Sequence, residues 1–176
     1  MHRTIFQTPI VNTLLRGFSV AFLKATGWKI EGHLPANGQK SVLIAAPHTS
    51  NWDLPYTLMV AYVLRLQIYW MGKSSIFSFP FGPVMRWLGG IPVDRSSPHN
   101  LVGSMATFFK QNPGLILCVP PEGTRKKVGR WRTGFYYIAL EAGIPIVMTV
   151  LDAEKRQIRI LGHHTPAGDA EREIRE

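Results

Sequence analysis

Two short polar segments hold the residue types that could carry out chemistry in this chain. Residues 48–53 read His-Thr-Ser-Asn-Trp-Asp and follow one apolar run, and residues 121–125 read Pro-Glu-Gly-Thr-Arg and follow another. A histidine paired with a carboxylate acts as a general base near neutral pH. The second segment places a carboxylate close to arginines, and such a set of fixed charged groups could hold a polar substrate. Acyl transfer to a hydroxyl is therefore the leading hypothesis.

The spacing of His48 and Asp53 leaves two interpretations. Five residues of regular helix turn the chain by about 500°, so the two side chains would not share a helix face. They meet if His48 ends a strand and Asp53 lies in the first turn of the next helix, where its carboxylate would hold one ring nitrogen protonated. Alternatively, Asp53 caps a helix that begins at Leu54, and His48 is structural.

The segment after the second motif is strongly basic, and it too leaves alternatives. It is either a solvated basic face or a phosphate site, since a guanidinium binds phosphate through two hydrogen bonds. Glu122 would accept a hydrogen bond from a substrate hydroxyl or satisfy Arg125 internally. Arg95 reads locally as a surface residue paired with Asp94. The basic segment surrounds Trp131 and contains Arg125, Lys126, Lys127, Arg130 and Arg132.

Composition indicates one folded domain with an anionic partner. The 176 residues are 45% hydrophobic and 18% charged, which excludes a disordered or coiled-coil chain. The formal net charge is +9, which suits nucleic acid, a phospholipid surface or a phosphorylated substrate. The single cysteine, Cys118, lies in an apolar run and is expected to be buried and unreactive.

Apolar patterning predicts alternating strands and helices and therefore an α/β sandwich with a mixed, largely parallel sheet. Turn signals, with proline and glycine at the boundaries, separate the segments. Strands are expected over 28–34, 41–46, 68–71, 91–93, 115–119, 145–151 and 157–161. Helices are expected over 54–66, 83–88, 97–111 and 134–142.

Three loops of this pattern follow strands and carry polar residues. They begin after Ala46, Val93 and Val119 and contain the two motifs and Arg95. Because ligands of α/β sheets bind at the carboxyl ends of the strands, we expect the three loops to converge.

Residues 1–26 are expected to form an amphipathic helix ahead of a domain over 27–176, whose C-terminal helix, from Asp169, is cut short. Either the apolar stripe packs on the core, or it lies in a membrane interface with Arg3, Arg16 and Lys24 near lipid head groups. We expect neither a membrane-spanning helix nor a signal peptide, because polar residues interrupt each apolar stretch. The stripe consists of Val11, Leu14, Leu15, Phe18 and Phe22.

At these residues the chain resembles the glycerolphosphate and lysophosphatidate (1-acylglycerol-3-phosphate, PlsC-like) acyltransferases, in a small bacterial branch. Four blocks occur in the order typical of that family, over roughly residues 40 to 150. They are 48–53, 90–95, 121–125 and the apolar segment 144–147.

The resemblance implies a mechanism and a set of site residues. His48 would deprotonate an acceptor hydroxyl that attacks an acyl thioester, and Asp53 would orient His48. The donor would be acyl-CoA or acyl carrier protein, with no metal or other cofactor. The acceptor, a phosphorylated glycerol or lysophospholipid, would contact Arg95, Glu122, Gly123, Thr124 and Arg125. Ile144, Pro145, Ile146 and Val147 would line or support the apolar part of the site.

The resemblance also implies a cytoplasmic protein that contacts the anionic inner face of the membrane. The alternative function is a non-catalytic basic protein that binds phospholipid or nucleic acid. A nucleic-acid partner would leave the pairing of His48 and Asp53 unexplained. A serine hydrolase is disfavoured because no Gly-x-Ser-x-Gly segment occurs. Zinc chemistry is disfavoured because His163 and His164 are adjacent and expected in an exposed loop.

Overall fold

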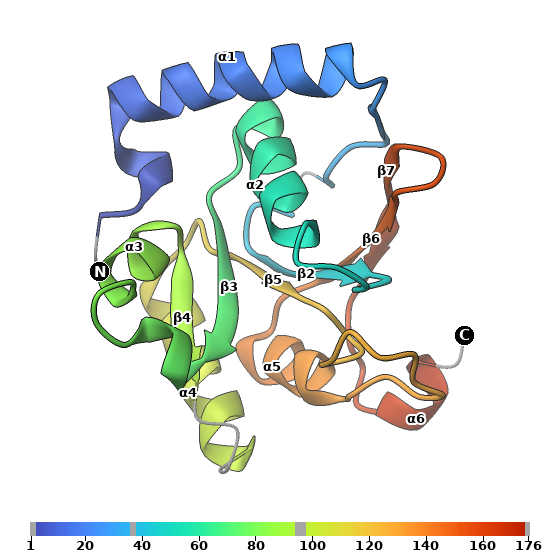
Figure 1. Ribbon diagram of the computed structural model, residues 1–176. Coiled ribbons are helices and arrows are strands. Elements are labelled where there is room, and N and C mark those ends of the chain that lie inside the picture. Colours follow the sequence, from blue (N-terminus) through green and yellow to red (C-terminus); the bar gives the residue numbers. More distant parts are fainter. Residues whose placement is uncertain (1–2, 36–37, 94–97, 175–176) are drawn as a thin grey trace.

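The computed structural model describes residues 3–35, 38–93 and 98–174. Alternating strands and helices build one α/β unit with a seven-stranded mixed sheet, as the sequence predicts (Figure 1). The strands are β1 (Lys29–Glu31), β2 (Ser41–Ala46), β3 (Ile68–Lys73), β4 (Gly90–Val93), β5 (Ile116–Val119), β6 (Ile146–Asp152) and β7 (Gln157–His164). The helices are α1 (Pro9–Ala25), α2 (Asp53–Leu64), α3 (Gly82–Trp87), α4 (Pro98–Gln111), α5 (Gly134–Ala142) and α6 (Ala170–Glu173), with short 3₁₀ turns η1 (Ile5–Gln7) and η2 (Ser74–Phe77).

The sheet order is β1-β7-β6-β2-β5-β3-β4, and every neighbouring pair is parallel except β6 and β7. The strand β2 lies between β6 and β5, with Val42 opposite Ile146 and Ile44 opposite Val119. The loops that follow β2 and β5 therefore leave the sheet side by side at its carboxyl edge. This adjacency brings the two polar motifs together.

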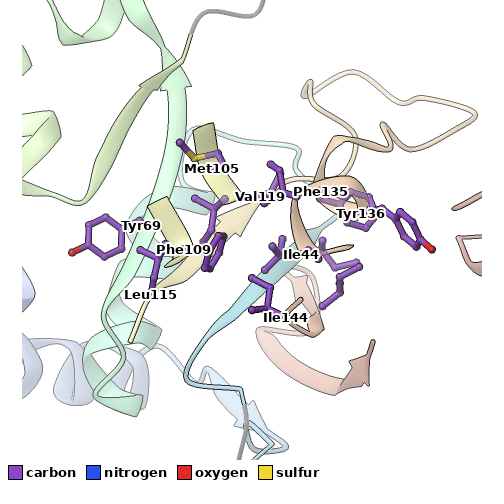
Figure 2. Close-up of a cluster of buried hydrophobic side chains, with 14 of the residues drawn as sticks. Ile44, Tyr69, Met105, Phe109, Leu115, Val119, Phe135, Tyr136 and Ile144 are labelled. Atoms are coloured by element: carbon purple, nitrogen blue, oxygen red, sulfur yellow. The ribbon is translucent and has the colours of Figure 1, made fainter. Parts of the chain in front are cut away.

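Side chains of the central strands alternate between two apolar layers, as the period of two in a strand requires. In β2, Val42 and Ile44 face the layer under α4 and α5, and Leu43 faces the layer under α2. Figure 2 shows the first layer, which includes Phe109 and Tyr136, at 0% and 1% exposure. Helices cover both faces of the sheet, which explains why the sequences of the central strands are continuous apolar runs.

The single cysteine lies in the second layer. Cys118, in β5, is buried, and this burial raises the pKa of its thiol to about 12. The expectation of a buried thiol is confirmed, and its lack of reactivity stays a prediction that the raised pKa supports, because a neutral thiol is a poor nucleophile.

The amphipathic helix predicted near the N-terminus is α1, and it has two distinct apolar sides. One side packs on the core, where Leu23 is buried and Val11 and Leu15 contact the layer under α2. The other side exposes Leu14 and Phe18, at 68% and 58%. Figure 1 shows α1 lying across one end of α2. In the described parts of the chain, no helix combines the length and the apolar character needed to cross a membrane.

The two adjacent histidines lie in a strand, so the prediction of a loop is wrong there. β7 extends to His164 and pairs with β6, which places His163 opposite Val147. The Glu173 carboxylate then accepts hydrogen bonds from His164 Nε2 at 2.5 Å and from Tyr136 Oη at 2.8 Å. These donors, the imidazole foremost, lower the pKa of Glu173 to about 2. His164 therefore holds the C-terminal helix in place.

Candidate active site

The two polar motifs meet at the carboxyl edge of the sheet. The loop after β2 carries His48, and the loop after β5 carries Glu122, whose Oε1 accepts a hydrogen bond from the His48 backbone N–H at 3.4 Å. The two residues are 74 positions apart in the chain. Parallel pairing of β2 and β5 thus positions them side by side. Arg95, predicted to join them from the loop after β4, lies outside the described residues.

His48 and Asp53 form the pair that the first motif predicts. The distance from His48 Nδ1 to Asp53 Oδ2 is 2.8 Å, and the two side chains are 29% and 14% exposed. Asp53 is the first residue of α2, so one short loop connects the end of β2 to the start of this helix. The partly exposed imidazole remains open to a substrate, whereas the carboxylate behind it is largely shielded.

Asp53 organises the loop before its helix and does not cap the helix, so the capping alternative is wrong. Its Oδ2 accepts hydrogen bonds from the backbone N–H groups of Thr49 and Ser50 at 2.8 and 2.9 Å. Both donors precede α2. An oxygen that already accepts two N–H bonds is an acceptor towards His48 as well, so His48 Nδ1 carries the proton. No described residue contacts the other ring nitrogen, Nε2, through a hydrogen bond, and it is free to accept a proton.

Glu122 has one occupied and one unoccupied oxygen. Oε1 accepts from the His48 N–H, and Oε2 is buried with no hydrogen-bond partner among the described residues. A buried polar atom without a partner costs free energy unless a ligand or water satisfies it. Glu122 does not pair with Arg125, which excludes the internal role considered for it.

Arg125 binds a residue that sequence reasoning did not single out. Its Nη1 donates a hydrogen bond to Asn51 Oδ1, in the middle of the first motif. The contact joins the two loops a second time and keeps the guanidinium beside the His48 loop. Spacing gave no signal for Asn51, because the contact spans 74 residues and depends on how the strands pair.

Gly123 and Thr124 shape the second loop. Gly123 has a φ of 65°, in the left-handed region that favours glycine, and a Cβ there would lie 3.2 Å from Arg132 Cγ. The Thr124 hydroxyl accepts a hydrogen bond from the backbone N–H of Lys126 at 3.3 Å. These contacts fold the loop back on itself, so that Arg125 reaches Asn51.

The apolar segment 144–147 lies elsewhere. Ile144, Ile146 and Val147 are at most 4% exposed, and Figure 2 shows Ile144 within the core. Ile146 pairs with Val42 near the amino end of β2, whereas His48 follows the carboxyl end. The segment therefore lies away from His48, and a lining role in the apolar part of the site stays a prediction. Pro145, buried with its neighbours, accepts a hydrogen bond from Val42 N through its carbonyl oxygen at 3.0 Å. Support of the site from within the core stays a prediction.

An apolar groove lies between α2 and the sheet, on the same face as Leu43 of β2 and its neighbour Val147 of β6. It is narrow, with a volume of about 40 Å³. Thr57 lies at the end nearer the site, since its hydroxyl bonds the Asp53 carbonyl oxygen at 2.7 Å, and Ala45 lies three residues before His48. The lining also includes Leu43, Val60, Ala61, Leu64, Leu66, Ile68, Thr149, Leu151, Ile158 and Ile160.

Taken together, the site offers a histidine suited to act as a general base and an oriented guanidinium, with a small apolar groove along α2 nearby. Within residues 3–35, 38–93 and 98–174, no group of three or more histidine, cysteine or acidic side chains is arranged to hold a metal ion. A base with a free Nε2 beside a cationic side chain suits proton abstraction from a hydroxyl on an anionic substrate.

Comparison with known proteins shows the family of the chain. The family model described as Acyltransferase matches residues 27–151. The 1-acyl-sn-glycerol-3-phosphate acyltransferases of Haemophilus influenzae and Escherichia coli are 28% and 25% identical over 76% of this chain. This chain spans 58% and 57% of their lengths.

A solved structure shares the fold. The crystal structure of the 1-acyl-sn-glycerophosphate (LPA) acyltransferase PlsC from Thermotoga maritima matches with a TM-score of 0.55 at 14% sequence identity. The match covers 94% of this chain and 77% of that one. The family model spans most of the α/β unit, including both polar motifs. The chain belongs to the Acyltransferase family.

Proposed function

We propose that this chain transfers an acyl group from a thioester to the free hydroxyl of a 1-acylglycerol-3-phosphate. The observation that carries the proposal is the 2.8 Å contact between His48 Nδ1 and Asp53, with Nε2 left free beside a basic loop. The names of the bacterial relatives support the same acceptor class. The donor is acyl-CoA or acyl carrier protein, and no cofactor is consumed.

The proposed reaction is general-base catalysis. His48 Nε2 takes the proton of the acceptor hydroxyl as its oxygen attacks the thioester carbonyl carbon. The tetrahedral intermediate then collapses, the carbon–sulfur bond breaks, and the leaving thiolate takes the proton back from His48. Asp53 stabilises the imidazolium formed in between, as the carboxylate of a catalytic triad does.

The acceptor phosphate is proposed to bind Arg125, with Arg95 as a second cation. Arg125 is exposed and already oriented by Asn51, so little side-chain entropy is lost when it binds. Gly123 and Thr124 hold the loop in shape, and the vacant Glu122 Oε2 is suited to accept a hydrogen bond from a hydroxyl of the acceptor.

Arg125→Ala is expected to raise the KM for the phosphorylated acceptor about 10- to 100-fold, because a charge-assisted hydrogen bond is lost. The KM for the acyl donor should change much less. Steady-state kinetics with each substrate varied in turn checks this result. Lys127→Ala, which removes an exposed charge from the same loop, is the matched control. Equal effects on both KM values would show that Arg125 is structural.

The donor's acyl chain is proposed to enter the apolar groove along α2. From Thr57 to Leu64 the helix rises by about 10 Å, so the groove extends away from His48 over several methylenes of an extended chain. Because its resting volume is only about 40 Å³, side chains along it must move when the chain enters. This movement favours flexible chains over branched or cyclic ones.

Val60→Phe should shift donor preference towards shorter chains, because the larger side chain fills the groove one turn beyond Thr57. Each methylene excluded from the groove should lower kcat/KM by about fourfold, the equivalent of 0.8 kcal/mol. A series of acyl-CoA donors of increasing length measures the shift. Val63→Phe places the same ring on α2 outside the groove lining and is the control. An unchanged length profile in Val60→Phe would place the acyl chain elsewhere.

Peripheral contact with the anionic inner face of the membrane is part of this proposal. Support comes from the exposed apolar side of α1 and from the net charge of +9. Such a location would give the cytoplasmic enzyme access to a lipid acceptor.

The proposal is tested by incubating the chain with acyl-CoA or acyl carrier protein and a 1-acylglycerol-3-phosphate. Phosphatidate should form, and thiol should be released only when the acceptor is present. Salt-dependent binding of single-stranded oligonucleotides without any turnover would favour the nucleic-acid alternative. Thiol release that ignores the acceptor would indicate a thioesterase.

A further inference from the structure

A second cleft lies between α1 and α2. None of the polar residues of the candidate active site lines it, although Ala61 and Leu66 line both this cleft and the apolar groove. The volume of the cleft is about 720 Å³. Two arginines face it, Arg16 from α1 and Arg65 from the residue that follows α2. Neither arginine makes an ion pair with a described residue. The lining is completed by Phe6, Asn12, Thr13, Gly17, Val20, Ala21, Ala61, Tyr62, Leu66 and Gln67, and it contains no acidic residue.

Two polar atoms in this lining are buried without a partner. Arg16 Nε and Tyr62 Oη have no hydrogen-bond partner among the described residues. Tyr62 is only 5% exposed, and burial raises its pKa to about 12, so its hydroxyl stays protonated and can donate. Each such atom calls for a ligand or ordered water that accepts a hydrogen bond. Arg16 Nε and Tyr62 Oη are both hydrogen-bond donors, and Arg65 adds a second guanidinium to the same cleft. This set of groups could bind an oxyanion.

Arg65 occupies a backbone conformation in which glycine would be favoured. Its φ of 57° and ψ of 40° are left-handed, as is usual for a glycine that ends a helix. An arginine there carries a conformational cost that glycine avoids. A side chain retained at this cost is consistent with a role for the guanidinium.

The cleft adjoins the exposed apolar side of α1. Gly17 and Ala21 line the cleft, and each lies three residues after a member of the exposed stripe, Leu14 and Phe18 respectively. Residues three apart are neighbours on a helix surface. If the stripe entered the acyl region of a bilayer, the two arginines would lie at the level of the phosphates.

The cleft is also remote from the pair that would carry out catalysis. Asp53 begins α2, whereas Ala61, Tyr62 and Arg65 lie at its other end. Eight residues of helix, from Asp53 to Ala61, span about 12 Å. A phosphate in the cleft is therefore not the phosphate of an acceptor in contact with His48.

We propose that the α1–α2 cleft binds the phosphate of an anionic membrane phospholipid through Arg16 and Arg65, with Tyr62 Oη as a third donor. Binding there fixes the orientation of the chain on the bilayer, with the exposed side of α1, which carries Leu14 and Phe18, inserted. The lipid is a docking ligand and is neither acyl donor nor acceptor. The inference does not depend on the proposed activity, because binding requires no turnover.

The test measures partitioning onto vesicles of phosphatidylglycerol mixed with phosphatidylcholine. The double variant Arg16→Lys, Arg65→Lys keeps the net charge but removes two-pronged phosphate binding, and it should bind about tenfold more weakly. Lys24→Gln removes one charge from the exposed part of α1 and should cost about fivefold at most. Partitioning of the Lys double variant equal to that of the wild type would overturn the proposal, since charge alone would then explain binding.

Two further measurements guard against misfolding and against a free ligand. Arg65→Gly removes the guanidinium and places glycine at a backbone position with left-handed φ and ψ. The variant should therefore bind vesicles more weakly, while its unfolding temperature stays equal or rises. Vesicle binding should also persist in His48→Ala, which separates this proposal from the catalytic one. Inorganic phosphate should displace the chain from vesicles more than sulfate does at equal ionic strength, because it would compete with the lipid phosphate for the two arginines. Phosphate that binds in the cleft but leaves vesicle binding unchanged would indicate a site for a free phosphate ligand and overturn lipid docking.

Discussion

His48→Ala is expected to slow acyl transfer about 10²- to 10⁴-fold, the usual contribution of a positioned general base. The imidazole is 29% exposed and belongs to neither apolar layer, so its loss should leave the fold intact. Thiol release from acyl-CoA in the presence of the lysophosphatidate acceptor measures the rate. Thermal unfolding of the same variant measures its stability.

Thr49→Ala is the matched control for His48→Ala. Thr49 is exposed in the same loop, and its contact with Asp53 is made by the backbone N–H, which alanine keeps. The control should therefore turn over like the wild type. If His48→Ala transferred the acyl group at the rate of the wild type, another group would have to remove the proton of the acceptor hydroxyl.

Asp53→Asn is expected to lower kcat by about 10²- to 10⁴-fold, because an amide next to Nδ1 favours the wrong tautomer of the imidazole. An asparagine amide N–H donating to Nδ1 would leave the proton on Nε2, which could then no longer act as a base. Because Oδ2 of Asp53 also accepts from the Thr49 and Ser50 N–H groups, an amide turned in this way would give up those two bonds as well. Rates at several pH values, together with circular dichroism, check this prediction.

Asp169→Asn replaces a carboxylate at the start of α6 that accepts a hydrogen bond from the Arg172 N–H, and it is the control for Asp53→Asn. A kcat for Asp53→Asn within a factor of a few of the wild type would show that Asp53 only shapes the loop.

Much of the fold could be predicted because its central strands are buried on both faces. Continuous apolar runs bounded by turn residues identified β2, β5 and β6, and the parallel arrangement followed from the helices between them. The proximity of His48 and Glu122 could also be predicted, because the loops that follow neighbouring parallel strands emerge at the same edge of the sheet. The final residues of β7 were missed because Gly162 and the two histidines after it carry no apolar pattern. They are held by antiparallel backbone bonds to β6.

The details of the site depended on contacts between distant segments. The interaction of Arg125 with Asn51 and the vacant oxygen of Glu122 arise from the pairing of β2 with β5, which no local spacing encodes. The segment 144–147 was assigned to the apolar part of the site by resemblance. In the structure it is buried towards the amino ends of β2 and β6, and the groove is lined by other residues, mainly of β2, α2, β6 and β7. Apolar periodicity marks burial, and it does not distinguish a core strand from a substrate channel.

The most direct test of the account is the rate of the double variant His48→Ala, Asp53→Asn. Asp53 is proposed to act only through His48, so removing both residues should cost no more than removing His48 alone. We expect the double variant to release thiol at the rate of His48→Ala. If the two losses multiply instead, Asp53 contributes independently of His48, and the proposed general-base pair is wrong.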